Sequence, residues 1–231
     1  MTYVMSDLHG CYDQYIKMLK KIQFSKNDEL YILGDVIDRG KEPIKILLDM
    51  AARDNVYAIL GNHELLALSV LPALLKEITH QNATDGMSEQ DIERLLFWQG
   101  EGGNTTLEKL QKLSPDERNY LLEYLREFML YDKIQVGKNT FILVHAGLGN
   151  FAPERPLSDY TAEELTLCRP DPNQCFFTDN TYLICGHTPT KLLCGKAEIY
   201  QNGNNIFIDC GAVFGGNLGC LCLETMEEFY V

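Results

Sequence analysis

Three short apolar runs near the start of the chain, each ending at polar residues beside a glycine, constrain the fold more than any other feature. The runs are Tyr3–Ser6, Leu30–Leu33 and Val56–Leu60. Between them, apolar residues recur at helical spacing, once from Tyr15 to Ile22 and once after Pro43. This alternation predicts a β-α-β-α-β unit with a parallel sheet. Parallel sheets place their binding sites at the carboxyl ends of strands, where the polar residues of this chain lie.

The pattern changes after the third run. From about residue 65 to 131 it is helical, with helix starts marked by Ser88 before Asp91 and by Ser114 before Glu117. We expect a helical insertion there. Strand-like runs then return at Lys133–Val136, Phe141–Val144, Tyr182–Cys185, Ile206–Ile208 and Gly219–Leu223. Because a domain averages about 150 residues, the 231-residue chain is expected to form a single α/β domain over residues 1–231.

Charge excludes some classes of partner. The 33 acidic and 20 basic side chains give a formal net charge of −13, which repels polyphosphate backbones and anionic membrane surfaces. We therefore expect neither nucleic acid nor a membrane as a partner. An anionic substrate would require a local positive centre.

The eight cysteines include no C-x-x-C pair and lie largely in apolar runs, which favours reduced, buried thiols over disulfides. The sequence begins with a strand-like run instead of a secretory signal, and no stretch of about 18 apolar residues occurs. The sequence thus predicts a cytoplasmic protein.

Oxygen and imidazole donors end five of the strand-like runs. A single Asp in such a place is more often a turn former or a helix cap. Five such positions from distant parts of the chain instead indicate an assembled metal site. No cysteine is among the donors, which favours Mn²⁺, Fe or Zn²⁺ with open coordination positions over a structural zinc centre. The donors are Asp7 and His9, Asp35, Asn62 and His63, His145, and His187, so that only His80 among the histidines lies outside the set.

The motifs that carry these donors resemble those of the calcineurin-like metallophosphoesterase superfamily. They are Asp7-Leu8-His9-Gly10, GDVIDRG at 34–40, GNHE at 61–64, HAG at 145–147 and GHTP at 186–189. Within this superfamily, the Asp38-Arg39 pair and Glu64 resemble the corresponding residues of the phosphoprotein phosphatase family of serine/threonine phosphatases. With the late run IDCGAVFGGNLGCL at 208–221, the likeness is greatest to the small bacteriophage lambda type and its bacterial relatives. The resemblance implies a two-sheet α/β/β/α sandwich.

The resemblance also implies two divalent metal ions, with Mn²⁺ expected and Fe or Zn²⁺ as alternatives. The implied ligands are Asp7, His9 and Asp35 for the first ion, and Asp35, Asn62, His145 and His187 for the second. Asp35 would then bridge the two ions at the separation of about 3.5–4 Å that clamps an in-line displacement. A hydroxide between them would be the nucleophile.

Further roles concern the phosphate and the leaving group. Arg39 matches the phosphate-binding arginine of the family, and Asn62 would also contact the phosphate. Arg169 matches a second arginine by position only, because cysteine and Pro-Asp-Pro stand where the family has a tryptophan-containing stretch. A loop role is its alternative. His63 would protonate the leaving group and Asp38 would orient it. Glu64 could instead be an acidic residue at a helix start.

These roles favour hydrolysis of phosphoserine or phosphothreonine in proteins, with phosphoproteins or phosphopeptides as partners. The first alternative is a symmetrical dinucleoside tetraphosphate hydrolase, in which the position of Asp38 is usually not acidic and that of Glu64 is usually aspartate. A metal-dependent nuclease conflicts with the charge of −13. An inactive phosphoprotein-binding module is a further alternative. Phosphotyrosine activity, the native metal and the oligomeric state stay open.

Overall fold

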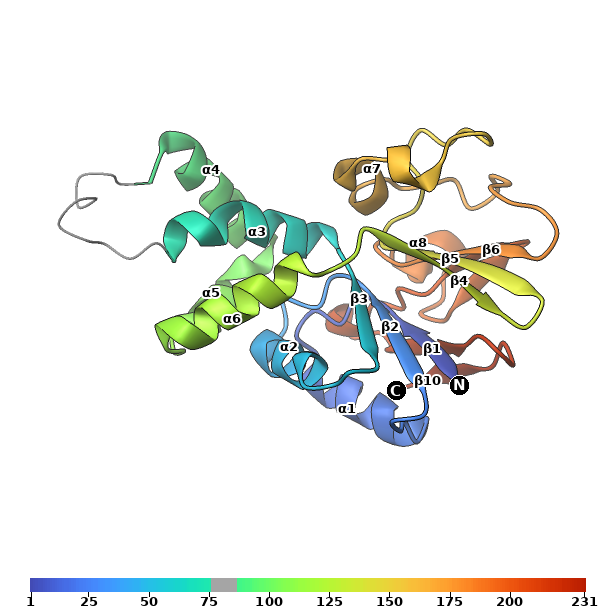
Figure 1. The fold of residues 1–231 in the computed structure, drawn as a ribbon, viewed down its shortest axis with the longest axis horizontal. Coiled ribbons are helices and arrows are strands. Elements are labelled where there is room, and N and C mark those ends of the chain that lie inside the picture. Colours follow the sequence, from blue (N-terminus) through green and yellow to red (C-terminus); the bar gives the residue numbers. More distant parts are fainter. Residues whose placement is uncertain (76–86) are drawn as a thin grey trace.

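Two five-stranded sheets pack face to face in the computed structural model, which describes residues 1–75 and 87–231 (Figure 1). The first sheet has the order β10-β9-β1-β2-β3, in which β1, β2 and β3 are parallel and β9 and β10 are antiparallel additions. Its strands are β1 (Thr2–Met5), β2 (Glu29–Leu33), β3 (Val56–Ile59), β9 (Gly219–Cys222) and β10 (Glu228–Tyr230). The predicted β-α-β-α-β unit is therefore confirmed.

The second sheet has the order β4-β5-β6-β8-β7, with a parallel centre and antiparallel edges. Its strands are β4 (Tyr131–Val136), β5 (Asn139–Val144), β6 (Thr181–Cys185), β7 (Tyr200–Asn202) and β8 (Asn205–Phe207). Sequence patterning missed β7 and β10, because each has only three residues and none of them is buried.

Helices flank both sheets and form the predicted insertion. They are α1 (Tyr12–Lys21), α2 (Pro43–Ala51), α3 (Asn62–Leu74), α4 (Glu89–Trp98), α5 (Asn104–Leu110), α6 (Pro115–Arg126), α7 (Ala162–Thr166) and α8 (Thr190–Cys194). Ser88 and Ser114 cap α4 and α6 with their side chains, as predicted. In Figure 1 the insertion helices α3–α6 gather beside β3, away from the second sheet. His80 lies outside the described residues.

Alternation along the strands produces separate apolar layers. Val4 and Leu33 point between the sheets and pack with Phe141 and Ile206, whereas Met5 points to the layer under the helices of the first sheet. A third layer lies between the second sheet and the segment around α7. The α/β/β/α class expected from the sequence is thus the observed fold.

The prediction of reduced, buried thiols is confirmed for some cysteines and wrong for others. All eight are free thiols, and the four in or beside strands are buried, but Cys175 and Cys194 are exposed. Cys175 lies in a loop and Cys194 ends the short helix α8, so neither is covered by a sheet. None of the helices in the described ranges has the length and apolarity needed to cross a membrane.

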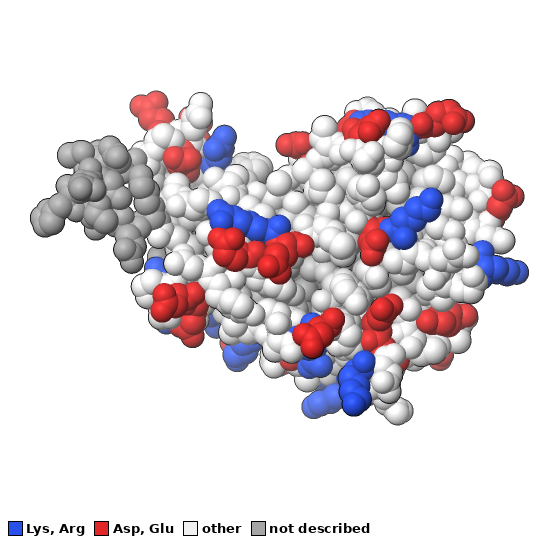
Figure 2. All heavy atoms as spheres, in the orientation of Figure 1, with Lys and Arg blue, Asp and Glu red and all other residues white. Residues whose placement is uncertain are grey.

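Acidic and basic side chains are interspersed on the face shown in Figure 2. The expectation that the chain binds neither nucleic acid nor a membrane stays a prediction.

Candidate metal centre and active site

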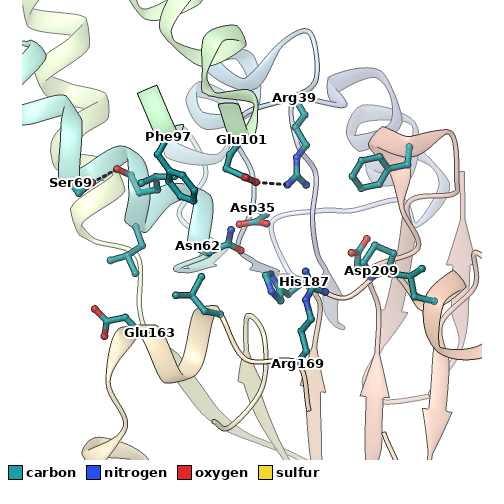
Figure 3. Close-up of a pocket in the computed structure, with 16 residues that line it drawn as sticks. Asp35, Arg39, Asn62, Ser69, Phe97, Glu101, Glu163, Arg169, His187 and Asp209 are labelled. Atoms are coloured by element: carbon teal, nitrogen blue, oxygen red, sulfur yellow. Dashed lines mark hydrogen bonds and ion pairs between the residues drawn. The ribbon is translucent and has the colours of Figure 1, made fainter. Parts of the chain in front are cut away.

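The carboxyl ends of strands from both sheets meet at one place, and the predicted donors lie there. Asp35 is central, because its carboxylate joins two groups of side chains, one with His9 and His63 and the other with His145 and His187. In each group the donor atoms lie within 4.8 Å of one another. In Figure 3, Asp35, Asn62 and His187 lie together in one pocket. Asp7 joins the cluster by accepting a hydrogen bond from the backbone N–H of His187, at 3.0 Å.

Backbone carbonyls fix the orientation of two of the histidines. His9 Nδ1 lies 2.9 Å from the oxygen of Ile37, and His145 Nδ1 lies 2.7 Å from that of Leu33. A carbonyl can only accept, so the proton is on Nδ1 and each Nε2 presents a lone pair. Burial, with a smaller contribution from neighbouring imidazoles, lowers the pKa of both histidines well below the ordinary value. Both are therefore neutral, as metal ligands must be.

The Nε2 lone pairs of both histidines face the Asp35 carboxylate. His145 Nε2 is 2.9 Å from Asn62 Oδ1 and 3.5 Å from one Asp35 oxygen, while His9 Nε2 is 3.5 Å from the other. Burial raises the pKa of Asp7 and Asp35 well above the ordinary value, with a further contribution from Asp209 for Asp7 and from Asp7 and Glu64 for Asp35. Carboxylates and neutral imidazole nitrogens are ligands of divalent cations, so these side chains would hold such ions, and Asp35 belongs to both groups of donors.

The backbone is strained at the same place. Of the ten non-glycine residues with positive φ in the described ranges, six are predicted site residues: Asp7, His9, Asp35, Asp38, Arg39 and His187. Left-handed backbone costs a non-glycine residue about 1 kcal/mol or more. Such strain clusters where function requires a particular side-chain direction.

His63 and Asp38 form the predicted pair. Asp38 Oδ2 accepts a hydrogen bond of 2.7 Å from His63 Nδ1, and both side chains are fully buried. Among residues 1–75 and 87–231, His63 Nε2 has no hydrogen-bond partner. That nitrogen is buried 3.9 Å from Asp35 Oδ2, so it lies beside the predicted metal donors.

Sequence reasoning missed two residues that hold Asp38. Trp98, at the end of α4, donates to Asp38 Oδ2 at 2.8 Å, and Thr106 of α5 donates to Oδ1 at 2.6 Å. The Asp38 backbone N–H in turn donates to the Thr106 hydroxyl. No motif marked either residue, because the insertion is where the resemblance says least.

Both predicted arginines line the pocket beside the donors. Arg39 Nη1 lies 2.7 Å from His9 Nε2, and Arg39 Nη2 lies 3.8 Å from Glu101 Oε2. Arg169 is exposed and donates to the hydroxyl of Thr188 at 3.1 Å. Arg169, which was matched by position only, therefore lines the same pocket as the residues of the motifs.

Glu64 faces the backbone and not the pocket. Its carboxylate accepts hydrogen bonds of 2.8–3.1 Å from the N–H groups of Asp35, Val36, Ile37 and Gly61. The helix-start alternative is therefore right but incomplete, because Glu64 also holds the loop that follows β2. A side chain at Gly61 would collide with the Asp35 and Glu64 carboxylates, so this contact requires glycine.

Asp209 is a further acidic residue in the pocket that sequence reasoning missed. It is buried, accepts from the backbone N–H of Gly211 at 2.9 Å, and has its pKa raised to about 6 by burial. The signal was present, since the strand-like run Ile206–Ile208 ends at Asp209, as the other runs end at donors.

Paired groups of aspartate and histidine at the strand ends of a two-sheet α/β fold define the class of metal-dependent phosphoesterases. The model of the calcineurin-like phosphoesterase family matches residues 2–208, and the chain belongs to that family. The more specific assignment to the phosphoprotein phosphatases is not established by this match.

The sequence relatives are named for an activity other than protein dephosphorylation, which the sequence motifs favour. Symmetrical bis(5'-nucleosyl)-tetraphosphatases from Erwinia tasmaniensis and Wigglesworthia glossinidia brevipalpis are 32% and 37% identical over 99 residues, which is 42% of this chain and 36% of each relative. One from Delftia acidovorans is 36% identical over 98 residues, 42% of this chain and 35% of the relative. The matched segment therefore spans about a third of these relatives.

Solved structures support the fold alone, because their identities are low. A provisionally assigned diadenosine tetraphosphatase has a TM-score of 0.69 at 18% identity, with 100% of this chain and 92% of that chain covered. A serine/threonine phosphatase from Saccharomyces cerevisiae with similarity to human PP5 has a TM-score of 0.58 at 16% identity, with coverages of 95% and 71%.

Proposed function

We propose that the chain is a phosphoesterase that uses two divalent cations to hydrolyse symmetrical dinucleoside tetraphosphates. The observation that carries the substrate class is the identity of 32–37% to symmetrical bis(5'-nucleosyl)-tetraphosphatases. The metal donors, the two arginines and the His63–Asp38 pair support the reaction class. This proposal replaces phosphoserine or phosphothreonine hydrolysis, which is the leading hypothesis from the sequence alone.

The residues have separate roles in this reaction. The cation ligands proposed above are Asp7, His9, Asp35, Asn62, His145 and His187, and the bound cations would activate a water and neutralise phosphate charge. Arg39 and Arg169 would pair with phosphate oxygens. Asn62 would also contact the phosphate.

The proposed reaction consumes one water molecule and breaks one P–O bond. Water adds to one of the two central phosphorus atoms and the central bridging P–O bond breaks. His63 would give a proton to the departing phosphate oxygen, and Asp38 would keep its ring oriented. Both halves leave as nucleoside diphosphates.

Hydrolysis of phosphoserine or phosphothreonine in proteins is the second candidate. In the sequence, the acidic residue Asp38 and the glutamate Glu64 favour this candidate over the tetraphosphatase. Glu64 binds four backbone N–H groups and Asp38 is enclosed by His63, Trp98 and Thr106. Because neither carboxylate faces the pocket, their identities bear on the architecture of the site more than on its substrate.

The test is a side-by-side assay with Mn²⁺ of diadenosine tetraphosphate and a phosphoserine peptide. We expect the tetraphosphate to be the better substrate and to give ADP as the only nucleotide product. Formation of AMP and ATP would contradict central cleavage, and turnover of the peptide alone would establish the second candidate. Asp35→Asn should be inactive on both substrates, which controls for contaminating enzymes.

A further inference from the structure

The pocket beside the donors is about 610 Å³ in volume, and exposed apolar side chains line its two sides. Figure 3 shows Phe97 on one side of Asp35, Asn62 and His187, and Asp209 on the other. Contiguous exposed apolar surface often marks a ligand-binding groove or a partner site. The chemistry of the two sides therefore bears on what the pocket holds.

The first wall is built by helices α3, α4 and α7. Leu65 and Leu66 come from α3, Phe97 comes from α4, and Leu167 follows α7. Phe97 is 62% exposed although its neighbour in sequence, Trp98, is completely buried. The end of α4 thus directs the Trp98 ring toward Asp38, whereas the Phe97 ring lies at the pocket.

The second wall surrounds Asp209. The Asp209 backbone oxygen accepts from Thr190 N–H at the start of α8, and Pro189 before this helix and Leu192 within it line the pocket with Asp209. Its carboxylate accepts from the N–H of Gly211, and the turn that begins there ends at Phe214. Phe214 is 67% exposed, and the Arg39 guanidinium lies 5.4 Å from its ring centroid.

We infer that Phe97 and Phe214 are stacking platforms for the two nucleobases of one substrate molecule. This inference rests on the proposed function and adds to it the residues that recognise the bases. A dinucleoside tetraphosphate carries a planar aromatic base at each end and its anionic groups in the middle. The pocket has the same order, with one exposed phenylalanine on each side and the metal donors and Arg39 between them.

Stacking suits these two residues for a physical reason. Base stacking on an aromatic side chain tolerates any base, because every base presents a π-face. Arg39, already close to the Phe214 ring, would bind a phosphate next to the stacked base. The two walls would therefore fix the substrate by its ends, which places the central bond over the donors.

The experiment measures binding by calorimetry, with Mn²⁺, of a methylene-bridged diadenosine tetraphosphate that cannot be cleaved. We expect Phe97→Ala and Phe214→Ala each to weaken binding about tenfold, in keeping with the loss of one stacked base. Phe97→Trp and Phe214→Trp should retain the affinity. Inorganic tripolyphosphate, which has no base, should bind all of these variants as it binds the wild type.

Leu96→Ala is the matched control, since Leu96 is as exposed as Phe97, at 62%, but does not line the pocket. It should leave the affinity unchanged. Unchanged analogue binding in both alanine variants, or an equal loss for tripolyphosphate, would overturn the inference. Failure of the wild type to turn diadenosine tetraphosphate into ADP would instead overturn the proposed function, which the calorimetry does not measure.

Discussion

His63 has one nitrogen held by Asp38 and a second with no partner in the described part of the chain. A general acid would need such a nitrogen without a partner. The metal donors could be predicted from sequence because each follows an apolar run, and the parallel strands bring these run ends together. Trp98 and Thr106 could not be predicted, because their contact with Asp38 depends on how α4 and α5 fold back over the site.

Replacement of His63 should affect substrates according to their leaving groups. We expect His63→Asn to lower kcat by roughly 10²–10⁴ on an alkyl phosphomonoester, if the chain turns one over, because an alkoxide must be protonated as it departs. The loss should be smaller on p-nitrophenyl phosphate and on diadenosine tetraphosphate, whose leaving groups are weak bases. Steady-state kinetics on the three substrates check this, with metal content measured alongside. Equal losses on all three, with metals retained, would contradict the assignment.

Glu164 offers a pH-dependent test away from the metal donors. Hydrogen bonds from Arg155, and then from Asn150 and the Thr161 backbone, lower the pKa of Glu164 from 4.5 to about 2. A carboxyl with a lowered pKa stabilises the fold above its unfolded-state pKa, and this contribution is lost as pH falls through the folded-state value.

Glu164→Gln should therefore have a lower Tm than the wild type at pH 7. The difference should shrink as the pH falls from about 4.5 toward about 2. Thermal melts across that range measure it. Glu163→Gln removes a charge from the exposed neighbouring residue and serves as the control. A Tm difference that persists unchanged at the lowest pH would contradict the ion-pair explanation.

At the scale of elements, the helical insertion is part of the active site. Its residues hold Asp38 and supply Phe97, and the Gly102 carbonyl accepts a hydrogen bond from the Arg39 backbone. The sequence predicted the helices α4 and α6 from their caps but gave no position for them relative to the sheets. That position depends on the side chains that α3 buries against α4 and α6. Hydrophobic periodicity predicts which face of a helix is buried but not which other helix covers it.

Loss of one Asp38 hydrogen bond should reduce turnover without removing the metals. Thr106→Val keeps the shape of the side chain and removes the donor to Asp38 Oδ1. We expect kcat to fall on the order of tenfold, since a hydrogen bond to a charged group contributes about 1.5–3 kcal/mol. Thr105→Val is the control, because Thr105 bonds only the Gly102 backbone. A changed KM with unchanged kcat would argue against a positioning role.

At the scale of the whole molecule, the net charge of −13 poses a problem for an anionic substrate. The pocket does not solve it with arginines alone, because four acidic residues line it beside Arg39 and Arg169: Asp35, Glu101, Glu163 and Asp209. Bound cations are needed to make this region attractive to phosphate. The order of the strands across each sheet likewise emerges only from the folded molecule, whereas the two-sheet class followed from the motifs.

Chelation should accordingly abolish binding as well as turnover. After treatment with EDTA and removal of the chelator, we expect no measurable affinity for the uncleavable tetraphosphate analogue. We also expect a lower Tm, because the ions bind the folded chain only. Addition of Mn²⁺ should restore both. Elemental analysis should find two ions per wild-type chain and fewer in His145→Asn. Retained affinity in the metal-free protein would contradict the electrostatic argument.

The hydrogen bond between Trp98 and Asp38 gives the protein an intrinsic optical reporter. Trp98 is the only tryptophan in the chain, it is completely buried, and its indole N–H ends 2.8 Å from a carboxylate next to the proposed proton donor. Indole emission responds to local charge and hydrogen bonding. Excitation at the red edge of indole absorption, where tyrosine does not absorb, would therefore follow metal loading and substrate arrival at His63 without a label.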